Sequence, residues 1–343
     1  MRIFWTVLFN AILLLGCQDS TPTKWQRSYA TKFISTNITA WGDSSRIETV
    51  LQDLLPWLED FQQRYRSGGP LDSLVYSAQT GDTIPLDSES FHIFSFALWF
   101  RDYSHGEIDV GVGNLLHAWK ISWQNDSARV PSDSELIRLT QDLQSPLYAM
   151  DSAKQAMIVL KTHHHFALGA FLEGAILEHI GHLLDSAECN NWLVDVSGDF
   201  LYRGTKPQNA PWRLGIKDPA QPSQLLATVD MLPGPRSFCT SGDYEQQFTD
   251  ARGHRHHHIL DPHTGQSTQG KHSVSVTTSL PDMNPNTLCT WFMILPLDSI
   301  QALTTRSQGQ IEAIVVQDSQ KIWVSSGLRP RMDVLVPGYQ ITP

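Results

Sequence analysis

Apolar residues recur at helical spacing through the first half of this chain. The Gly-Gly-Pro segment at 68–70 ends a predicted helix whose apolar face is formed by Ile47, Val50, Leu51, Leu54, Leu55, Leu58 and Phe61. A second helix is predicted over 88–99 after an acidic start, and Ser132 with Glu135 fits the capping box of a third. Residues 170–184 predict a fourth. Helices are therefore expected to dominate this half.

After residue 190 the pattern changes to short alternating or apolar runs separated by Gly, Pro and Asp. Such runs predict strands, here at 192–196, 212–216, 225–231, 257–260 and 273–277. A helix is expected at 288–295, a final hairpin from 311–316 and 321–324, and an irregular tail from 331 to 343. Helices and strands mixed without strict alternation indicate an α+β (mixed α/β) fold of sheets flanked by helices.

Composition and charge narrow the class of protein. The chain has 343 residues, of which 41% are apolar and 17% charged, so it can bury a substantial core in one large domain or two closely packed halves. The net charge of −10 and the scattered Lys and Arg argue against a nucleic-acid partner, because phosphate binding needs clustered cations.

The N-terminus reads as a targeting segment. Arg2 precedes an apolar run over 3–15, and Leu14-Leu15-Gly16-Cys17 looks like the lipobox of bacterial lipoproteins. We expect a signal peptide over 1–16, lipidation of Cys17 and a polar tether over 17–29, so that the protein is anchored to a membrane of the bacterial cell envelope and faces the periplasm. The alternative is a buried N-terminal apolar helix. The remaining cysteines, Cys189, Cys239 and Cys289, are interpreted as buried apolar residues that form at most one disulfide.

The densest chemical signal lies between residues 240 and 265. Thr240-Ser241-Gly242-Asp243-Tyr244-Glu245 predicts a hydroxyl-rich turn, whose backbone N–H groups could approach a phosphate or a ring carbonyl. His256-His257-His258 follows, next to a strand that ends at Asp261-Pro262. The three histidines could equally form a surface metal patch, although only two of them could share one face of a strand.

These segments resemble the ApbE family, which carries Thr-Ser-Gly-Asp-Tyr-Glu, then His-Ile-Ile-Asp-Pro-x-Thr-Gly, then a Ser-Val-Thr-Val strand, here at 273–276. Three upstream segments are also similar to family motifs: 106–113 with Trp119, 193–199, and 211–219. The resemblance covers roughly residues 30 to 325, so we assign 30–330 to the domain and 331–343 to a tail.

The resemblance implies a protein that binds FAD with Mg²⁺, splits its pyrophosphate and transfers FMN to a Ser or Thr of an acceptor flavoprotein in a membrane redox complex. Two related hypotheses are a non-catalytic FAD-binding envelope lipoprotein and an FAD pyrophosphatase that releases FMN and AMP. A third, a lipoprotein that binds metal through its histidine clusters, belongs to a different class.

The resemblance also implies site residues. The metal ligands would be the backbone carbonyl of Leu172 and the side chains of Asn286 and Thr290. His257 or His258 would lie beside the flavin, and His258, the better match to the motif, would be the candidate catalytic base. The implied cofactor-binding residues are Ala118, Trp119, Lys120, Gly169, Ala175, Gly198, Asp199, Thr240, Ser241, Gly242, Asp243, Ile259 and Leu260. Taken singly, Trp119 also reads as a core residue, Asp199 as a turn former and Thr290 as a helix residue bonded to its own backbone.

Several positions depart from the family pattern. Asn286 stands where Asp is usual, and an amide oxygen is a weaker ligand for a hard cation than a carboxylate, so Asn286→Asp is expected to raise metal-dependent turnover. Glu173 replaces a common Lys and Ala167 a common Asp; Asp195 and Ser77 also differ. The flavin hypothesis requires that the segments around Gly242, Asp261 and Thr290 converge on one cleft.

Overall fold

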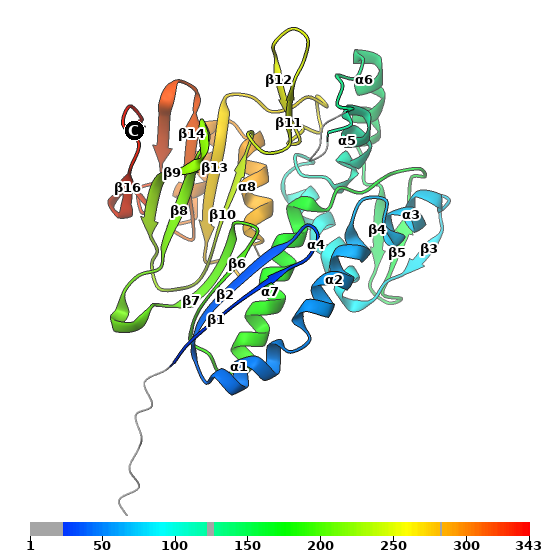
Figure 1. Ribbon diagram of the computed structural model, residues 1–343. Coiled ribbons are helices and arrows are strands. Elements are labelled where there is room, and N and C mark those ends of the chain that lie inside the picture. The colour runs from blue at the N-terminus through cyan, green and yellow to red at the C-terminus, as the bar shows by residue number, and fades with distance from the viewer. Residues whose placement is uncertain (1–22, 122–126, 282) are drawn as a thin grey trace, which may run out of the picture.

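The computed structural model describes residues 23–121, 127–281 and 283–343, which form an α+β fold around a large mixed sheet (Figure 1). The strands of this sheet follow the order β1-β2-β6-β7-β10-β13-β14-β15-β17, and only the last pair is parallel. Their bounds are β1 Thr23–Ala30, β2 Ser35–Gly42, β6 Asn191–Val196, β7 Asp199–Gly204, β10 Gly234–Gly242, β13 Lys271–Thr278, β14 Ile311–Gln317, β15 Lys321–Val324 and β17 Gln340–Thr342.

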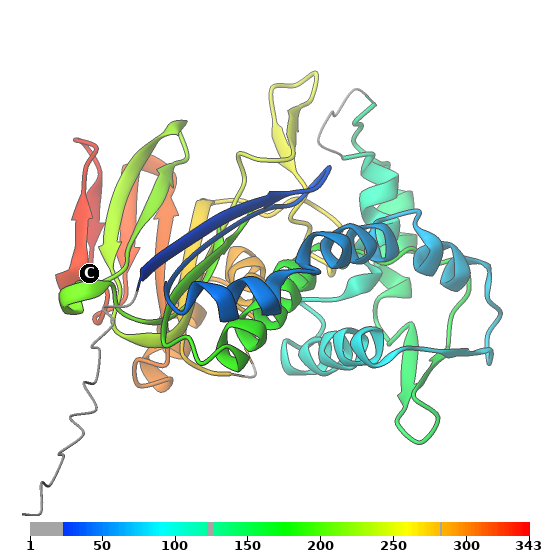
Figure 2. The ribbon, with the colours of Figure 1, turned by 60° about the horizontal axis from the view of Figure 1, so that its bottom comes forward.

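Both faces of this sheet are covered. Helices α7 (Gly169–Ser186) and α8 (Pro285–Ile294) pack side by side against one face (Figures 1 and 2). A second sheet of β8 (Arg213–Asp218), β9 (Gln221–Asp230) and β16 (Met332–Val334) encloses a separate apolar core that contains Trp212, Phe238 and Ile314. Coverage on both sides explains why six consecutive residues of β14 are buried, since side chains on both faces of the strand reach a core. All six are apolar except Glu312, which pairs with Arg331.

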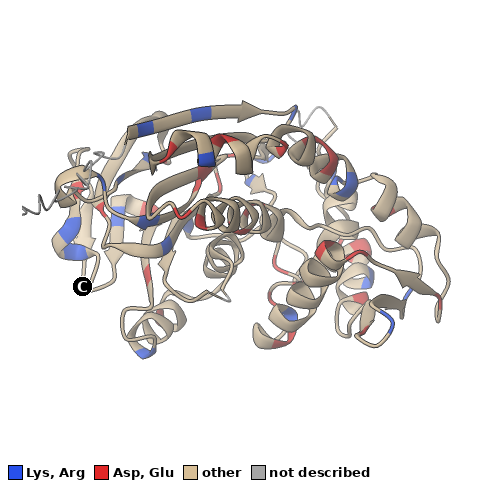
Figure 3. Ribbon diagram, turned by 90° about the horizontal axis from the view of Figure 1, so that it is seen from below, with Lys and Arg blue, Asp and Glu red and all other residues tan. Residues whose placement is uncertain are grey.

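Most of the remaining elements form the helical part at the right of Figure 1, whereas the first helix lies beside α7 at the bottom and the last strand pair of this group projects at the top. These remaining elements are α1 (Ser44–Leu51), α2 (Leu54–Tyr65), α3 (Pro70–Ser77), α4 (Ser88–Tyr103), α5 (Gly113–Trp119), α6 (Asp133–Asp142), the sheet of β3 (Thr83–Pro85), β5 (Ala156–Val159) and β4 (Tyr148–Asp151), and the pair β11 (Gln247–Thr249) and β12 (Arg255–His257). Helix α9 (Leu297–Arg306) follows α8 and packs on β14. Lys and Arg are dispersed over separate elements on the side that Figure 3 shows.

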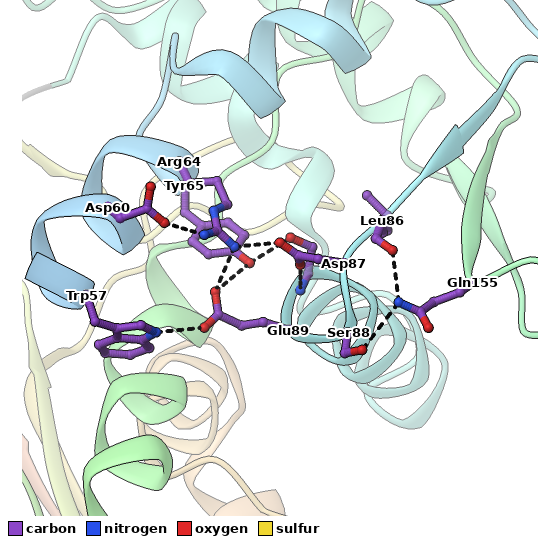
Figure 4. A network of polar contacts seen from close by, with 10 residues as sticks. Trp57, Asp60, Arg64, Tyr65, Leu86, Asp87, Ser88, Glu89 and Gln155 are labelled. Carbon is purple, nitrogen blue, oxygen red and sulfur yellow. Dashed lines mark hydrogen bonds and ion pairs between the residues drawn. The ribbon is translucent and has the colours of Figure 1, made fainter. Parts of the chain in front are cut away.

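A polar network joins α2 to the start of α4 (Figure 4). Arg64 donates to Asp87 at 2.6 Å and to Glu89 at 3.2 Å, and it also pairs with Asp60 within its own helix. The Tyr65 hydroxyl lies 2.7 Å from that of Ser90. Asp87 caps α4 as well, because its carboxylate accepts the backbone N–H of Ser90, so this one carboxylate stabilises a helix end and a helix–helix contact.

The structure confirms most predicted elements and divides one of them. Helices at 88–103, 133–142 and 169–186 match the sequence pattern, Ser132 accepts the N–H of Glu135 as a cap, and β14 and β15 form the expected hairpin. The first predicted helix is split into α1 and α2 around Gln52 and Asp53. Pro56 accounts for this, because proline fits the first turn of a new helix but would interrupt the hydrogen bonds of a continuous one.

Four boundaries differ from the sequence prediction. Residues 240–242 end strand β10 and do not form a turn, since β13 continues to pair with them, and β12 ends at His257. Residues 23–29 of the predicted tether belong to strand β1, and the predicted irregular tail contributes β16 and β17. The proposed signal peptide and Cys17 lie outside the described residues. Within the described ranges, no helix has the length and apolarity to cross a membrane.

Candidate active site

A cavity of about 740 Å³ opens between the large sheet and the helical part. Its wall includes Gly242 at the end of β10, Pro262 after the histidine segment, and Thr290 on α8. The turn between β1 and β2 and the N-terminal turn of α7 complete the wall. The three segments that the flavin hypothesis required to converge therefore face one cavity.

The structure brings ten of the sequence-predicted site residues to this cavity: Gly169, Asp199, Thr240, Ser241, Gly242, His258, Ile259, Leu260, Asn286 and Thr290. The other eight do not line it: Ala118, Trp119, Lys120, Leu172, Ala175, Gly198, Asp243 and His257. Several of these support the wall from behind. Trp119 is fully buried and donates its indole N–H to the carbonyl of Gly265 at 2.8 Å, which fixes the turn after Asp261; its reading as a core residue is confirmed.

Asp199 and Asn286 form the polar centre of the cavity. The first residue of β7, Asp199, is 6% exposed, and its Oδ2 accepts a hydrogen bond from the Asn286 amide at 2.6 Å. Burial raises the pKa of Asp199 to about 6, although the hydrogen bond from Asn286 acts in the opposite direction. The amide at position 286 thus serves as a donor to a buried carboxylate, a role that an Asp at this position could not fill.

Four further acidic residues that were not predicted as site residues line the cavity: Glu107, Asp109, Glu173 and Glu245. Glu173 and Glu245 have raised pKa values. Glu173 has one carboxylate oxygen buried without a hydrogen-bond partner, and burial together with the nearby Asp199 raises its pKa to about 8. Burial also raises the pKa of Glu245, whereas Lys217 lowers it. Both positions were visible in the sequence, Glu173 as a departure and Glu245 inside the best-matched motif, but only the fold shows that they face one space.

The donor atoms at this centre fit a hard divalent cation. Magnesium prefers carboxylate, amide and hydroxyl oxygens, and Asp199, Asn286 and Thr290 supply these, with the unpartnered oxygen of Glu173 nearby. Among the described residues, no three His, Cys, Asp or Glu side chains lie together in an arrangement that could hold a metal by themselves. An ion here would therefore depend on amide, hydroxyl or backbone oxygens and on oxygens of a bound ligand.

The two candidate histidines lie in different environments. His258 lines the cavity, its Nδ1 is buried without a hydrogen-bond partner, and burial lowers its pKa to about 4, so the ring is neutral at pH 7. In His257 both ring nitrogens are engaged: Nε2–H donates to the carbonyl of Thr268 at 2.8 Å, and Nδ1 accepts the N–H of Ile259 at 3.3 Å. Of the two histidines, only His258 lines the cavity and has a ring nitrogen without a hydrogen-bond partner.

The other charged residues of these segments have structural partners. His256 packs against Trp119 and lies 3.3 Å from a carboxylate oxygen of Asp250. Asp243 pairs with Arg255 and, at 2.9 Å, with Nδ1 of His272. The three consecutive histidines therefore point into different surroundings and do not form a joint metal patch.

Comparison with known proteins places the chain in a family. The sequence profile described as the ApbE family matches residues 28–315. The FAD:protein FMN transferase of Vibrio cholerae serotype O1 is 25% identical over 341 residues, which cover 96% of this chain and 99% of that protein. The FAD:protein FMN transferase of Klebsiella pneumoniae is 26% identical, and the alignment covers 96% of this chain and 97% of that protein. The transferase of Treponema pallidum is also 26% identical, with 85% of this chain and 83% of that protein covered.

Solved structures share the fold. The ApbE protein of Thermotoga maritima superposes with a TM-score of 0.76 at 22% identity and covers 89% of this chain and 98% of its own. The flavin transferase ApbE from Vibrio cholerae gives 0.73 at 22% identity, over 90% and 99%. With the profile match over 28–315 and relatives aligned along most of its length, this chain belongs to the ApbE family.

Proposed function

We propose that this chain is a Mg²⁺-dependent FAD:protein FMN transferase that attaches FMN to a Ser or Thr of a membrane redox protein. The observation that carries the proposal is the cavity shared by Asp199, Asn286, Thr290 and His258, which combines oxygen ligands for a cation with an imidazole whose Nδ1 has no hydrogen-bond partner. Its volume of about 740 Å³ lies in the range of small-molecule and cofactor sites.

The reaction is a phosphoryl transfer. The acceptor hydroxyl oxygen attacks the phosphorus of the FMN half of FAD, the P–O bond to AMP breaks, and AMP leaves with the bridging oxygen. The imidazole of His258 takes the hydroxyl proton, and its low pKa keeps the ring neutral before the substrates bind. Magnesium, when bound, offsets the negative charge of the diphosphate.

The chain's own residues prepare this site. Asn286 holds Asp199 by the 2.6 Å hydrogen bond and so fixes the direction of its second oxygen. The cationic side chains of the cavity wall are those of Lys32 and Lys217. Besides Asp199, its acidic side chains are those of Glu107, Asp109, Glu173 and Glu245. A dianionic diphosphate entering such a wall needs a cation to compensate its charge, which is why we expect FAD binding to depend on magnesium.

The test is an incubation of the chain with FAD, MgCl₂ and a purified redox protein stripped of its covalently bound flavin. The proposal predicts that the acceptor becomes fluorescent on a denaturing gel and that AMP appears in equal amount. AMP without labelled acceptor would favour the pyrophosphatase alternative, and bound FAD without AMP the non-catalytic one. Asn or Gln at position 258 should reduce transfer by at least a hundredfold while FAD affinity changes little.

We also propose that the chain is anchored to an envelope membrane through a lipid on Cys17 and faces the periplasm. The support is the apolar run and Leu-Leu-Gly-Cys segment that precede the folded part. Cys17→Ser should move the protein from the membrane fraction to the soluble fraction and abolish incorporation of labelled fatty acid. Unchanged fractionation with no acyl label in the parent chain would overturn this proposal.

A further inference from the structure

Asn284 links the two helices that carry the candidate magnesium ligands. It is the N-cap of α8, where its Oδ1 accepts the backbone N–H groups of Asn286 at 3.0 Å and Thr287 at 3.4 Å. Capping of this kind satisfies donors that a helix leaves unpaired in its first turn. The cap therefore determines where α8 begins and, with it, the positions of Asn286 and Thr290.

The same side chain also reaches α7. Its Nδ2 donates to the carbonyl of Phe171 at 2.9 Å, and one turn along α8 the hydroxyl of Thr287 donates to the carbonyl of Ala170 at 2.6 Å. Two consecutive carbonyls at the start of α7 are thus bound by α8. They lie less than one turn before Glu173, which lines the cavity.

Gly174 provides the space for this contact. A Cβ at position 174 would overlap the amide of Asn284, so the close approach of the two helices requires glycine here. The next residue back along α7 is Glu173, whose carboxylate faces the cavity. The position of Glu173 relative to Asn286 and Thr290 consequently depends on one amide group.

We propose that Asn284 is a positioning residue: its amide sets the spacing between the oxygens of α7 and those of α8, and so determines how well the site holds magnesium and FAD. This inference rests on the proposed function for its effect on turnover. Its effect on the geometry of the two helices stands on the hydrogen bonds alone. Asn284 does not line the active-site cavity and is not expected to contact the reacting atoms.

The sharpest variant is Asn284→Asp. A carboxylate can still accept the N–H groups of Asn286 and Thr287, so the cap of α8 remains, but it cannot donate to Phe171 and would face that carbonyl with a negative charge. We expect the melting temperature to stay within a few degrees of the parent. The magnesium concentration that gives half-maximal AMP release should rise at least tenfold, as should the Kd for FAD measured by flavin fluorescence.

Ser132→Ala is the matched control, because Ser132 caps α6 away from the cavity. It should lower the melting temperature by an amount typical of a lost cap and leave magnesium dependence and FAD affinity unchanged. Unchanged magnesium dependence and FAD affinity in Asn284→Asp would overturn the proposal.

A double-mutant cycle tests the contact with Gly174. Gly174→Ala alone should weaken FAD binding because the methyl group displaces the Asn284 side chain, whereas in an Asn284→Ala background the space is free and the same change should have little further effect. Additive effects on FAD affinity and melting temperature would contradict the contact. If the parent chain released no AMP from FAD, the proposed function would fail, while this cycle would still decide the role of Asn284.

Discussion

At the scale of single residues, the site depends on polar groups held in surroundings that disfavour their charged forms. His258 is the clearest case, because its Nδ1 is buried without a partner and its pKa is lowered to about 4 by burial. The sequence identified this histidine through a motif but could not distinguish its environment from that of His257. The difference between the two rings arises from the backbone carbonyl of Thr268, which binds one of them and not the other.

The lowered pKa of His258 predicts a pH effect on stability. The folded chain keeps this ring neutral down to about pH 4, whereas the unfolded chain protonates it near its ordinary value of 6.5. Stability is therefore lost as the pH falls from about 6.5 to about 4, by up to about 3 kcal/mol for a shift of this size. Urea unfolding of His258→Gln should show a shallower loss across this range, with His105→Gln, an exposed histidine, as the control. An equally steep loss in both variants would contradict the assigned environment.

Asn286→Asp should make the metal-free protein less stable and its response to magnesium larger. The new carboxylate would stand where an amide now donates to Asp199 at 2.6 Å, and two adjacent carboxylates repel each other unless a cation lies between them. In EDTA at pH 8 the melting temperature of the variant should fall below that of the parent, and MgCl₂ should raise it by more degrees than it raises the parent's. Equal magnesium-induced shifts in both proteins would show that Asn286 is not at the cation site.

At the scale of elements, periodicity predicted the helices well and the strand ends poorly. Helix α7 is 18 residues long, so the spacing of its apolar residues predicts it clearly. The glycine in Thr240-Ser241-Gly242 instead predicts a turn. In the structure β13 pairs with these residues, and β10 therefore extends to residue 242. Strand ends are decided by partners far along the chain, which spacing does not reveal. Pro56 could have predicted the break between α1 and α2, because its effect is local.

Close packing between elements gives a prediction for α5. A Cβ at Gly113 would overlap the backbone carbonyl of His165, whereas a Cβ at Gly111 would meet the ends of the Leu143 and Leu147 side chains. Backbone atoms cannot move aside as side chains can, so Gly113→Ala should lower the free energy of unfolding by about 3 kcal/mol or more and Gly111→Ala by about 1–2 kcal/mol. Urea midpoints measured for both variants check this order, and a larger loss for Gly111→Ala would refute it.

At the scale of the whole molecule, the cavity is assembled from segments that lie far apart in sequence, from the β1–β2 turn to α8. The family motifs predicted many of the residues that line it, because the motifs of a family mark positions that lie together in the shared fold. Glu173 and Glu245 were not predicted as site residues, because the sequence does not show that residues so far apart along the chain line the same cavity. The last strands were also missed, since β16 and β17 are each three residues long and exist only through pairing with β9 and β15.

Removal of residues 331–343 is therefore expected to destabilise the domain. It would delete β16 and β17, uncover part of the core around Trp212, and remove the hydrogen bond from the Tyr339 hydroxyl to Asp218 at 2.8 Å. The melting temperature should drop by at least about 3 °C, as expected for a loss of about 2 kcal/mol in a domain of this size. Tyr339→Phe, which removes only the hydroxyl, should change it far less; a truncated chain as stable as the parent would mean that these strands contribute nothing.

The thiols of Cys189, Cys239 and Cys289 are all free and at most 2% exposed. None can meet an alkylating reagent unless the surrounding strands and helices separate, so the rate of their labelling records how often the folded chain opens. Cys239 and Cys289 lie directly beside Thr240 and Thr290 of the cavity wall. A ligand that occupies the cavity should slow the labelling of these two thiols more than that of Cys189. The ratio of the labelling rates would therefore report ligand binding without a fluorophore and without turnover.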